Sequence, residues 1–368
     1  MKKEALLTIL LLSGLTSVAQ TTTITAYTPG VSTEGAVYYL PKTAINVSFT
    51  IEKSTYTPGE LCQYADRYLR INNISKTEDM HYSIKSATLS SEGLPDSAKA
   101  YHVKFTTNSV APLITLNESG ILLGVNSADT SYTAEEITAT PSNASSSTIN
   151  PRDYMTEEML MTGSKAKLAE LAAKEIYNIR ESRNLITRCQ NENIPKDGEG
   201  IRIILDELQK QEEVLMQLFT GTTSTEYTTH TFQIIPETDV NKVILGRFSR
   251  KLGILHPDDL AGAPIYIDIK GSNDVPMPVE EPEEDTKKKK KTKTAKKKAE
   301  DDQDGIVYNV PEKTEIKVYT NSETLAEKSF PIAQFGNVET LSSDFFNKKK
   351  AIKITLSPIT GALLKVEE

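Results

Sequence analysis

The sequence of 368 residues contains no tryptophan, two cysteines and four histidines. The histidines are scattered, and no two stand at the i, i+4 spacing that presents two zinc ligands on one helical face, so the pattern of a zinc hydrolase is missing. Without tryptophan the chain lacks the strongest side chain for stacking on sugars, although 15 tyrosines remain for that role. The G-x-S-x-G elbow, the P-loop and the G-x-G-x-x-G fingerprint are also missing, and we predict neither a cofactor nor a metal site.

Long apolar runs are missing too, with one short exception at the N-terminus. Lys2 and Lys3 precede an apolar run from Leu6 to Leu12, and the small residues Ser17 and Ala19 complete the pattern of a signal peptide over residues 1–19. No later stretch approaches the roughly 18 apolar residues of a membrane span, and no cysteine stands at the cleavage point to accept a lipid. We therefore expect export through a cleaved signal peptide to the periplasm or to association with the outer membrane, with no transmembrane span and not as a lipoprotein.

The chain also lacks an excess of positive charge, since its formal net charge is −8. Such a chain has no broad attraction for nucleic acid, and we predict no nucleic-acid partner. A lysine-rich block invites the opposite interpretation, but between Glu280 and Asp304 nine lysines face nine acidic residues. The pattern predicts a disordered, self-neutralising insertion over residues 273–304. Residues 128–150, rich in Ser and Thr, are predicted to be a solvated linker.

What the chain does contain is a pair of amphipathic helices within residues 151–221. Apolar residues recur at spacings of three, four and seven on both sides of a short link that begins at Asn193, and a short link folds neighbouring helices back antiparallel. Ser164 is the expected N-cap of the first helix, and Gly221 is the expected stop of the second. Two helices bury only one seam between them, so we expect the remaining apolar width to pack on a sheet.

The regions on either side of the helices read as strands, and they resemble each other. The segment Gly35-Ala-Val-Tyr-Tyr-Leu-Pro41 recurs as Gly305-Ile-Val-Tyr-Asn-Val-Pro311, each followed by an alternating strand. Farther along, residues 114–125 recur as residues 354–366, each as a strand, a glycine-containing turn and a strand. Two matches in the same order favour a duplication.

These patterns predict an α+β fold in which two β-rich regions, each a sandwich or partly open barrel, flank an antiparallel helical hairpin. The predicted domains are a signal peptide (1–19), an N-terminal β-rich domain (20–127), a linker (128–150), the helical hairpin (151–221), a C-terminal β-rich domain (222–272 and 305–368) and the charged insertion (273–304).

Candidate site residues lie on the first helix. Tyr177, Arg180, Glu181 and Arg183 crowd about two turns, and Arg183 stands where the apolar stripe would otherwise continue. We predict that it pairs with a buried carboxylate on the sheet, the alternative being contact with an external ligand.

The two cysteines admit two interpretations. In an oxidising compartment Cys62 and Cys189 are able to form one disulfide, if their geometry permits it. Otherwise each is a small buried apolar residue on a helix.

Several segments together resemble a known family. They are Tyr177 to Arg183, Pro195 to Gly198, Asp206 to Leu208, Leu218 to Thr222, Tyr39 to Thr43 and Ala333 to Asn337. They resemble the domain-of-unknown-function family 4831 of exported Bacteroidota proteins, over nearly the whole mature chain. The resemblance implies export into a bacterial envelope but no activity, ligand or catalytic residue. In that phylum Asp96-Ser97-Ala98 resembles an O-glycan acceptor, which implies O-glycosylation at Ser97.

The function that these observations favour is that of an exported, non-catalytic structural or interaction protein of the envelope, with an envelope protein or a glycan as its partner. Two alternatives are a hydrolase of envelope or dietary polymers with scattered carboxylates, and a glycan-binding module with exposed tyrosines. The oligomeric state stays open.

Overall fold

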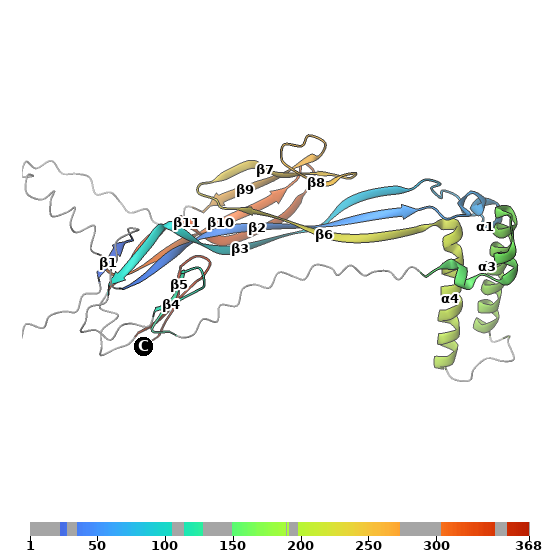
Figure 1. Ribbon diagram of the computed structural model, residues 1–368, viewed down its shortest axis with the longest axis horizontal. Helices are drawn as coiled ribbons and strands as arrows, with labels where there is room; N and C mark the ends of the chain where they lie inside the picture. Colours follow the sequence, from blue (N-terminus) through green and yellow to red (C-terminus); the bar gives the residue numbers. More distant parts are fainter. Residues whose placement is uncertain are drawn as a thin grey trace, which may run out of the picture.

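The computed structural model shows an elongated molecule with a β-rich body at one end and a group of helices at the other (Figure 1). The predicted signal peptide, most of the predicted linker (128–150), most of the predicted insertion (273–304) and Cys189 lie outside the residues that the structure describes. Those residues are 23–27, 35–104, 114–127, 149–188, 190, 198–272, 303–342 and 352–367.

The strands form three antiparallel sheets, which confirms the predicted β-rich α+β class. The first sheet has the order β6-β2-β3-β1, formed by Thr222–Ile234, Ala36–Thr57, Asp79–Lys104 and Thr23–Ala26. The second has the order β11-β10-β9-β7-β8, formed by Thr324–Ser342, Gln303–Tyr319, Ala263–Gly271, Val240–Ser249 and Gly253–Leu255. The third has the order β13-β12-β5-β4, formed by Leu363–Glu367, Lys353–Leu356, Leu122–Val125 and Ile114–Leu116. Short pairing of β1 with β10 joins the first two sheets.

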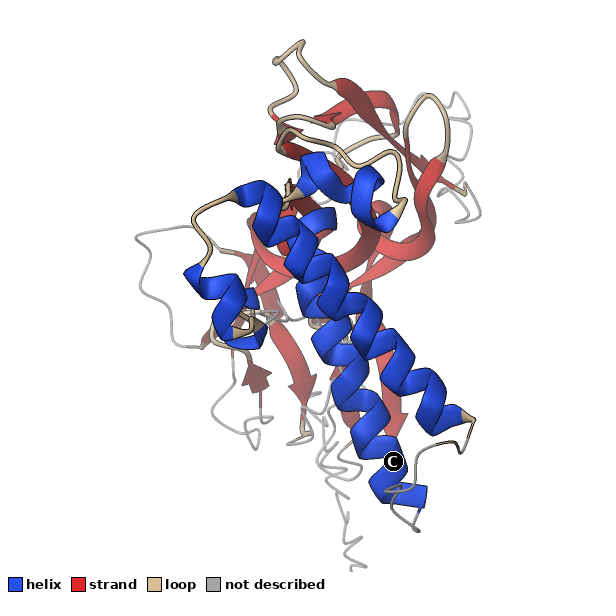
Figure 2. Cartoon of the chain, turned by 90° about the vertical axis from the view of Figure 1, so that its right-hand side faces the viewer, coloured by secondary structure: helices blue, strands red, loops and turns tan. Residues whose placement is uncertain are grey.

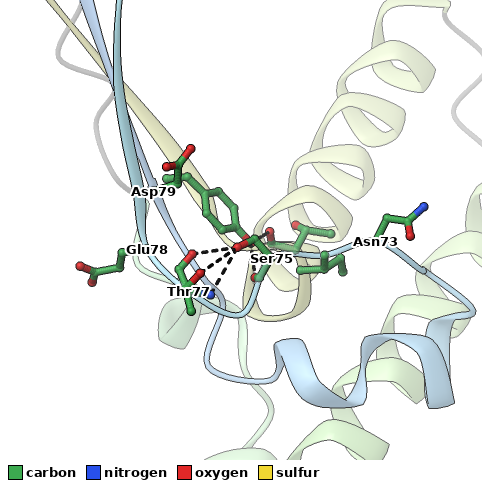
Figure 3. A pocket seen from close by; sticks show the side chains of 8 residues that line it. Asn73, Ser75, Thr77, Glu78 and Asp79 are labelled. Carbon is green, nitrogen blue, oxygen red and sulfur yellow. Dashed lines mark hydrogen bonds between the residues drawn. The ribbon is translucent and has the colours of Figure 1, made fainter. Parts of the chain in front are cut away.

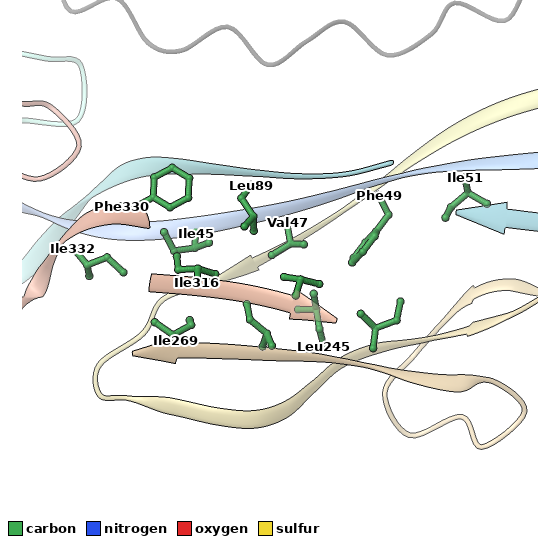
Figure 4. Packing of buried hydrophobic residues seen from close by; sticks show 13 residues of the cluster. Ile45, Val47, Phe49, Ile51, Leu89, Leu245, Ile269, Ile316, Phe330 and Ile332 are labelled. Atoms are coloured by element: carbon green, nitrogen blue, oxygen red, sulfur yellow. The ribbon is translucent and has the colours of Figure 1, made fainter. Parts of the chain in front are cut away.

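The main hydrophobic core lies between the first two sheets (Figure 4). Alternate residues of β2 point into it, which is the period of two expected for a strand with one buried face. Its members include Ile45, Val47, Phe49, Ile51, Ile265, Ile267, Ile269, Ile316, Val318 and Ile332. Burying each such side chain contributes roughly 1.5–3 kcal/mol, so this layer is the main source of stability in the body.

The two β-rich sequence ranges share strands and cores. β6 comes from the C-terminal range, yet it pairs with β2 of the N-terminal range from Thr222 to Ile234. β12 likewise pairs with β5. The predicted domain boundaries stay a prediction, but the strands of the two ranges form one sandwich body.

The two sequence repeats occupy equivalent places in this body. Gly35, directly before β2, and Gly305, near the start of β10, have φ angles of 149° and 137°, and a β-bulge follows in each strand at the proline. Each repeat then binds the turn of its own hairpin in the same way. The Tyr39 N–H donates to the Gly120 carbonyl at 2.9 Å, and the Asn309 N–H donates to the Gly361 carbonyl at 3.2 Å. The equivalent bulges and turns support the duplication that the sequence predicts.

A smaller core holds the two repeats together. The buried Tyr38 hydroxyl accepts a hydrogen bond from the Val307 N–H at 3.0 Å, so β2 reaches the start of β10. Burial raises the pKa of Tyr38 well above its usual range and keeps the phenol neutral. The buried Asn309 carboxamide donates to the Pro41 and Thr360 carbonyls at 3.0 and 2.8 Å. These buried bonds fix the third sheet against both repeats.

The helices form a separate unit, here called the helical head (residues 58–74 and 151–220). It contains η1 (Cys62–Tyr64), α1 (Ala65–Leu69), η2 (Pro151–Tyr154), α2 (Glu157–Met161), α3 (Lys165–Thr187) and α4 (Gly198–Thr220). The long helices α3 and α4 lie side by side, which confirms the predicted helical pair (Figure 2).

The core of the helical head consists of residues from helices and adjoining loops, among them Leu61, Leu69, Met159, Ala172, Ile176, Leu215 and Phe219. The sequence predicted packing on a sheet. The structure instead covers the helical pair with the short η1, α1 and α2 segments, because a β-ribbon separates the pair from the sheets of the body (Figure 1).

A three-stranded β-ribbon, made of residues 52–57, 79–83 and 222–227, connects body and head (Figure 1). β2 has 22 residues and spans roughly 70 Å at about 3.3 Å per residue. On one face of the ribbon, the Glu52 carboxylate lies 2.9 Å from the Lys85 ammonium and accepts a hydrogen bond from the Tyr227 hydroxyl at 3.0 Å. The hydrogen bond from Lys85 is the main cause that lowers the pKa of Glu52. Polar pairs thus replace apolar packing where the ribbon leaves the core.

Two glycines make the ribbon and head fit closely. Gly221 has a φ of 77° and ends α4 directly before β6, as the sequence predicts, and a Cβ there would lie 2.3 Å from the Thr57 carbonyl. A Cβ on Gly59 would lie 2.3 Å from the Leu218 carbonyl. The Leu61 N–H donates to that carbonyl at 2.7 Å, so the end of β2 is fastened to α4.

Candidate functional site

The predicted arginine cluster gathers around one carboxylate on the facing helix. The Arg180 Nε of α3 lies 2.6 Å from the Glu212 Oε1 of α4, and the Arg183 Nη1 lies 2.9 Å from the Glu212 Oε2. The Glu212 side chain is 12% exposed, whereas the two arginines are 33% and 36% exposed. Two charge-assisted contacts on one shielded carboxylate fix the register of α3 against α4.

The sequence predicted this carboxylate on the sheet. The structure places the partner on α4. Glu212 follows Leu208 by four residues and precedes Leu215 by three, so it interrupts the apolar stripe of its own helix in the same way as Arg183. Two charged residues of opposite sign that interrupt facing stripes are the signal that would have found the pair.

Tyr177 and Glu181 are placed differently from the arginines. The Tyr177 hydroxyl donates to the Tyr68 carbonyl at 3.1 Å, which ties α3 to the end of α1, and its ring is 47% exposed. The Arg180 guanidinium lies 5.7 Å from the centre of that ring, within the range of a cation–π contact. Glu181 is exposed on α3. The cluster therefore consists of Tyr177, Arg180, Arg183 and Glu212.

A cavity of about 500 Å³ lies beside this cluster. Its lining residues are Arg183, Gln209, Glu212, Glu213, Met216 and Thr220. The Gln209 carboxamide donates to Glu213 at 2.7 Å, so the cavity wall is itself hydrogen-bonded. The arginines and acids balance in charge, and this arrangement suits a polar contact between helices.

A second, polar cavity of about 590 Å³ lies where the β-ribbon meets the helical head (Figure 3). Its lining residues are Tyr56, Asn73, Ile74, Ser75, Thr77, Glu78, Asp79 and Thr220. The Tyr56 hydroxyl lies 3.0 Å from the Ser75 carbonyl and 2.9 Å from the Thr220 carbonyl. Burial raises the pKa of Tyr56, which keeps its hydroxyl a donor to these carbonyls. In both cavities the two acidic residues are sequence neighbours, Glu212 and Glu213 on α4 and Glu78 and Asp79 at the start of β3.

The remaining candidate residues lie apart from these cavities. Cys62 is half-buried at the start of η1, while Cys189 lies outside the described residues, so the disulfide stays a prediction. Ser97 is exposed on β3, and the Asp96 carboxylate beside it accepts a hydrogen bond from the Ala98 N–H at 3.0 Å.

Among the described residues, no three His, Cys, Asp or Glu side chains lie close enough together to hold a metal ion. His81 lies 3.6 Å from Asp79, and His256 lies 3.3 Å from Asp258. Within the same residues, no helix has the length and apolar content needed to cross a membrane.

The fold and its cavities define an elongated β-rich α+β protein that carries a helical head on a β-ribbon. The chain belongs to the family described as Domain of unknown function (DUF4831), whose family model matches residues 34–364, and the resemblance seen in the sequence is thereby confirmed. No curated protein and no solved structure matches the chain. The description of the family assigns no activity.

Proposed function

We propose that the protein is exported through the signal peptide of residues 1–19 and works in the bacterial envelope as a non-catalytic interaction protein. In this proposal the helical head binds a partner protein, and the β-ribbon holds the head at a distance from the body. The observation that carries the proposal is the separation of the two cores. The head core, with Ile176 and Phe219 at its centre, shares no residue with the body core around Phe49, in the part of the chain that the structure describes.

The cost of building the β-ribbon supports this role. Ordering each residue costs about 1–2 kcal/mol of backbone entropy, and the ribbon returns little apolar burial for that cost, since Glu52, Lys85 and Tyr227 cover it instead. The β-ribbon therefore adds little to the stability of the fold. It is needed if its role is that of a spacer that presents the head to another molecule.

The surface of the head suits a protein contact. Its exposed large apolar side chains are Leu160, Met161, Tyr177, Leu185 and Ile203, which are 39–80% exposed. Exposed apolar side chains near charged ones are typical of protein contact surfaces. Ile203 lies on the half of α4 remote from the head core.

Site-specific photo-crosslinking in the native envelope tests the proposal. A crosslinking side chain at Ile203 is expected to give one defined protein adduct, whereas the same group at Leu260 of the body, which is 81% exposed, gives none. Equal adducts from both positions, or adducts from Leu260 alone, would remove the role of the head. Mass spectrometry of the purified protein checks export, with Gln20 expected as the first residue of the mature chain.

A glycan-binding role is the second candidate, and the polar cavity is the observation that favours it. The side chains of Asn73, Ser75 and Thr77 offer a carboxamide and hydroxyls, the groups that hydrogen-bond to sugar hydroxyls. A glycan array probed with the protein and with the Asn73→Ala variant tests this role. Binding that the variant loses supports it, and equal signals from both proteins oppose it.

A further inference from the structure

The outer edge of β6 is long and regular. The strand has 13 residues, Thr222–Ile234, and it pairs with β2 along its whole length without a bulge. Among the residues that the structure describes, β2 is the only strand paired with it, so β6 forms the end of the first sheet. Such an edge presents a row of backbone N–H and C=O groups to any added strand.

Sheet edges are normally protected against added strands by proline, lysine, bulges or covering segments. The long edge of β11 has Lys328, Pro331 and a bulged register opposite Val310 and Glu312. β6 contains no proline, lysine, glycine or bulge, and six of its residues are threonine, a good strand former. The unprotected edge therefore differs from the other long edge of the molecule.

β3 is protected in a similar way. It contains Pro95 and a bulge at Lys85, and neighbouring segments cover parts of its edge. It pairs with β1 from Tyr101 onwards, and the Tyr82 N–H donates to the Arg250 carbonyl at 2.7 Å. The long edges of β11 and β3 are thus protected, whereas the edge of β6 is not, which indicates that β6 binds an added strand.

The side chains of β6 indicate what kind of strand it would accept. Phe232 and Ile234 pack against the body core but stay half-buried, and Phe232 makes an edge-to-face contact with Phe49 at 5.9 Å between ring centres. By alternation Glu226 faces the same side of the sheet. Its side chain is 63% exposed and lies 3.2 Å from the Lys53 ammonium. One end of the edge is therefore apolar, and the other end carries the exposed carboxylate of Glu226, paired with Lys53.

We propose that β6 binds an extended segment of a partner polypeptide as an additional antiparallel strand. The segment carries apolar side chains beside Ile234 and Phe232, and a basic side chain farther along beside Glu226. Backbone hydrogen bonds supply affinity, and the side chains set direction and register. This binding site is distinct from the helical head.

The placement of α4 favours a single added strand over a second copy of the chain. α4 ends directly before the start of β6 and lies at a steep angle to the strand (Figure 1). An antiparallel second copy paired along the whole of β6 would bring its own body toward this helix. A single strand alongside β6 needs only the usual spacing of about 4.8 Å.

The test measures binding of a fluorescent peptide, Ile-Thr-Val-Thr-Thr-Thr-Thr-Thr-Arg, to the full-length mature chain by anisotropy. Saturable binding is expected, and Thr228→Lys, which adds a protecting charge to the middle of the edge, should weaken it by about tenfold or more. Ser329→Lys adds the same charge to the exposed surface of β11 and should leave binding unchanged. Circular dichroism and thermal melting verify that both variants fold.

A second variant separates edge binding from non-specific adhesion. Glu226→Gln should weaken binding of the arginine peptide but not of the same peptide ending in glutamine. The proposal is overturned if the reversed-sequence peptide binds equally well, if Thr228→Lys binds like the unaltered protein, or if no peptide binds. It is equally overturned if light scattering shows a dimer that Thr228→Lys dissociates, because a second copy then occupies the edge. None of these results depends on crosslinking at Ile203. The experiments can therefore contradict the proposed role of the head and the proposed binding site on β6 independently of each other.

Discussion

The sandwich body and the helical head both bury apolar side chains, but they collect them over different distances along the chain. The body core joins Ile45 of β2 to Ile267 of β9 and Ile316 of β10, which are separated by more than half of the sequence. The head core is formed mainly between Met159 and Phe219, with Leu61 and Leu69 joining it from the segment around η1 and α1. Long-range pairing has to close large loops before its contacts form, whereas the contacts between α3 and α4 close only the short link between these two helices.

We therefore expect body and head to lose stability separately when a residue in one of the cores is replaced. The chain passes from body to head along β2, returns along β3 and returns again along β6. Within the described residues, the β-ribbon, the close contacts at Gly59 and Gly221 and the hydrogen bonds of Tyr56 couple the two cores. A mutation in the body core should therefore act on the whole molecule, because the ribbon strands begin there, while a mutation in the head core should act locally.

The largest effect is expected from Phe49→Ala. Phe49 is fully buried and contacts Phe232 of β6, so its loss leaves a cavity between the sheets and loosens two strands of the ribbon. We expect a loss of about 3–5 kcal/mol in the free energy of unfolding, measured by urea denaturation. The exposed Leu260→Ala should change it by no more than about 0.5 kcal/mol. Equal effects of the two changes would contradict the assignment of the main core.

The next largest effect is expected from Ile176→Ala, at about 2–5 kcal/mol for the stability of the head. Ile176 is fully buried between the helices. Hydrogen exchange should show loss of protection in α3 and α4, with β9 and β10 unchanged. Asn178→Ala, on the exposed face of α3, serves as the control. If strands and helices lost protection together, body and head would be one cooperative unit and the comparison would fail.

Most of the fold could be predicted from local patterns. The helical pair follows from apolar spacing, and Gly221 as its end follows from the need for a positive φ directly before β6. The repeats at Gly35 and Gly305 were visible because the same backbone conformation requires the same residues. Strand partners could not be predicted, because the pairing of β6 with β2 depends on the head lying between them in the chain.

The candidate site was predictable in part. The unusual position of Arg183 indicated a buried carboxylate, but only the register of α3 against α4 identifies Glu212 as that carboxylate. The polar cavity has no sequence signal, since it arises where the loop around Ser75 passes the end of α4 at Thr220. Sites that form between segments far apart in sequence need the tertiary structure to be seen.

A smaller effect is expected from Glu212→Ala. The change removes the shared partner of Arg180 and Arg183, but both arginines are about one-third exposed and water replaces part of the contact. We expect a loss of about 1–2 kcal/mol in stability of the head, measured by denaturation with hydrogen exchange on α4. Glu181→Ala removes an exposed acid next to Arg180 on α3 and should change stability by no more than about 0.5 kcal/mol. Similar losses of stability in both variants would mean that the change in net charge, and not the loss of the Glu212 contact, is the cause.

The smallest effect is expected on the β-ribbon, from Lys85→Met. The hydrogen bond from Lys85 is the main cause of the lowered pKa of Glu52, so its removal should raise that pKa toward the ordinary value. A carboxyl with a lowered folded-state pKa adds stability above its unfolded pKa, and this stability is lost as pH falls through the folded pKa. The variant should therefore show a weaker decline of stability on the acid side. Carboxyl NMR titration of Glu52 measures the shift directly, and Lys76→Met, on an exposed loop, should leave it unchanged. If the Glu52 titration were unaltered in Lys85→Met, the hydrogen bond from the Tyr227 hydroxyl would be sufficient to keep the pKa of Glu52 low. The bulge at Lys85 would then matter for the geometry of the sheet and not for this ion pair.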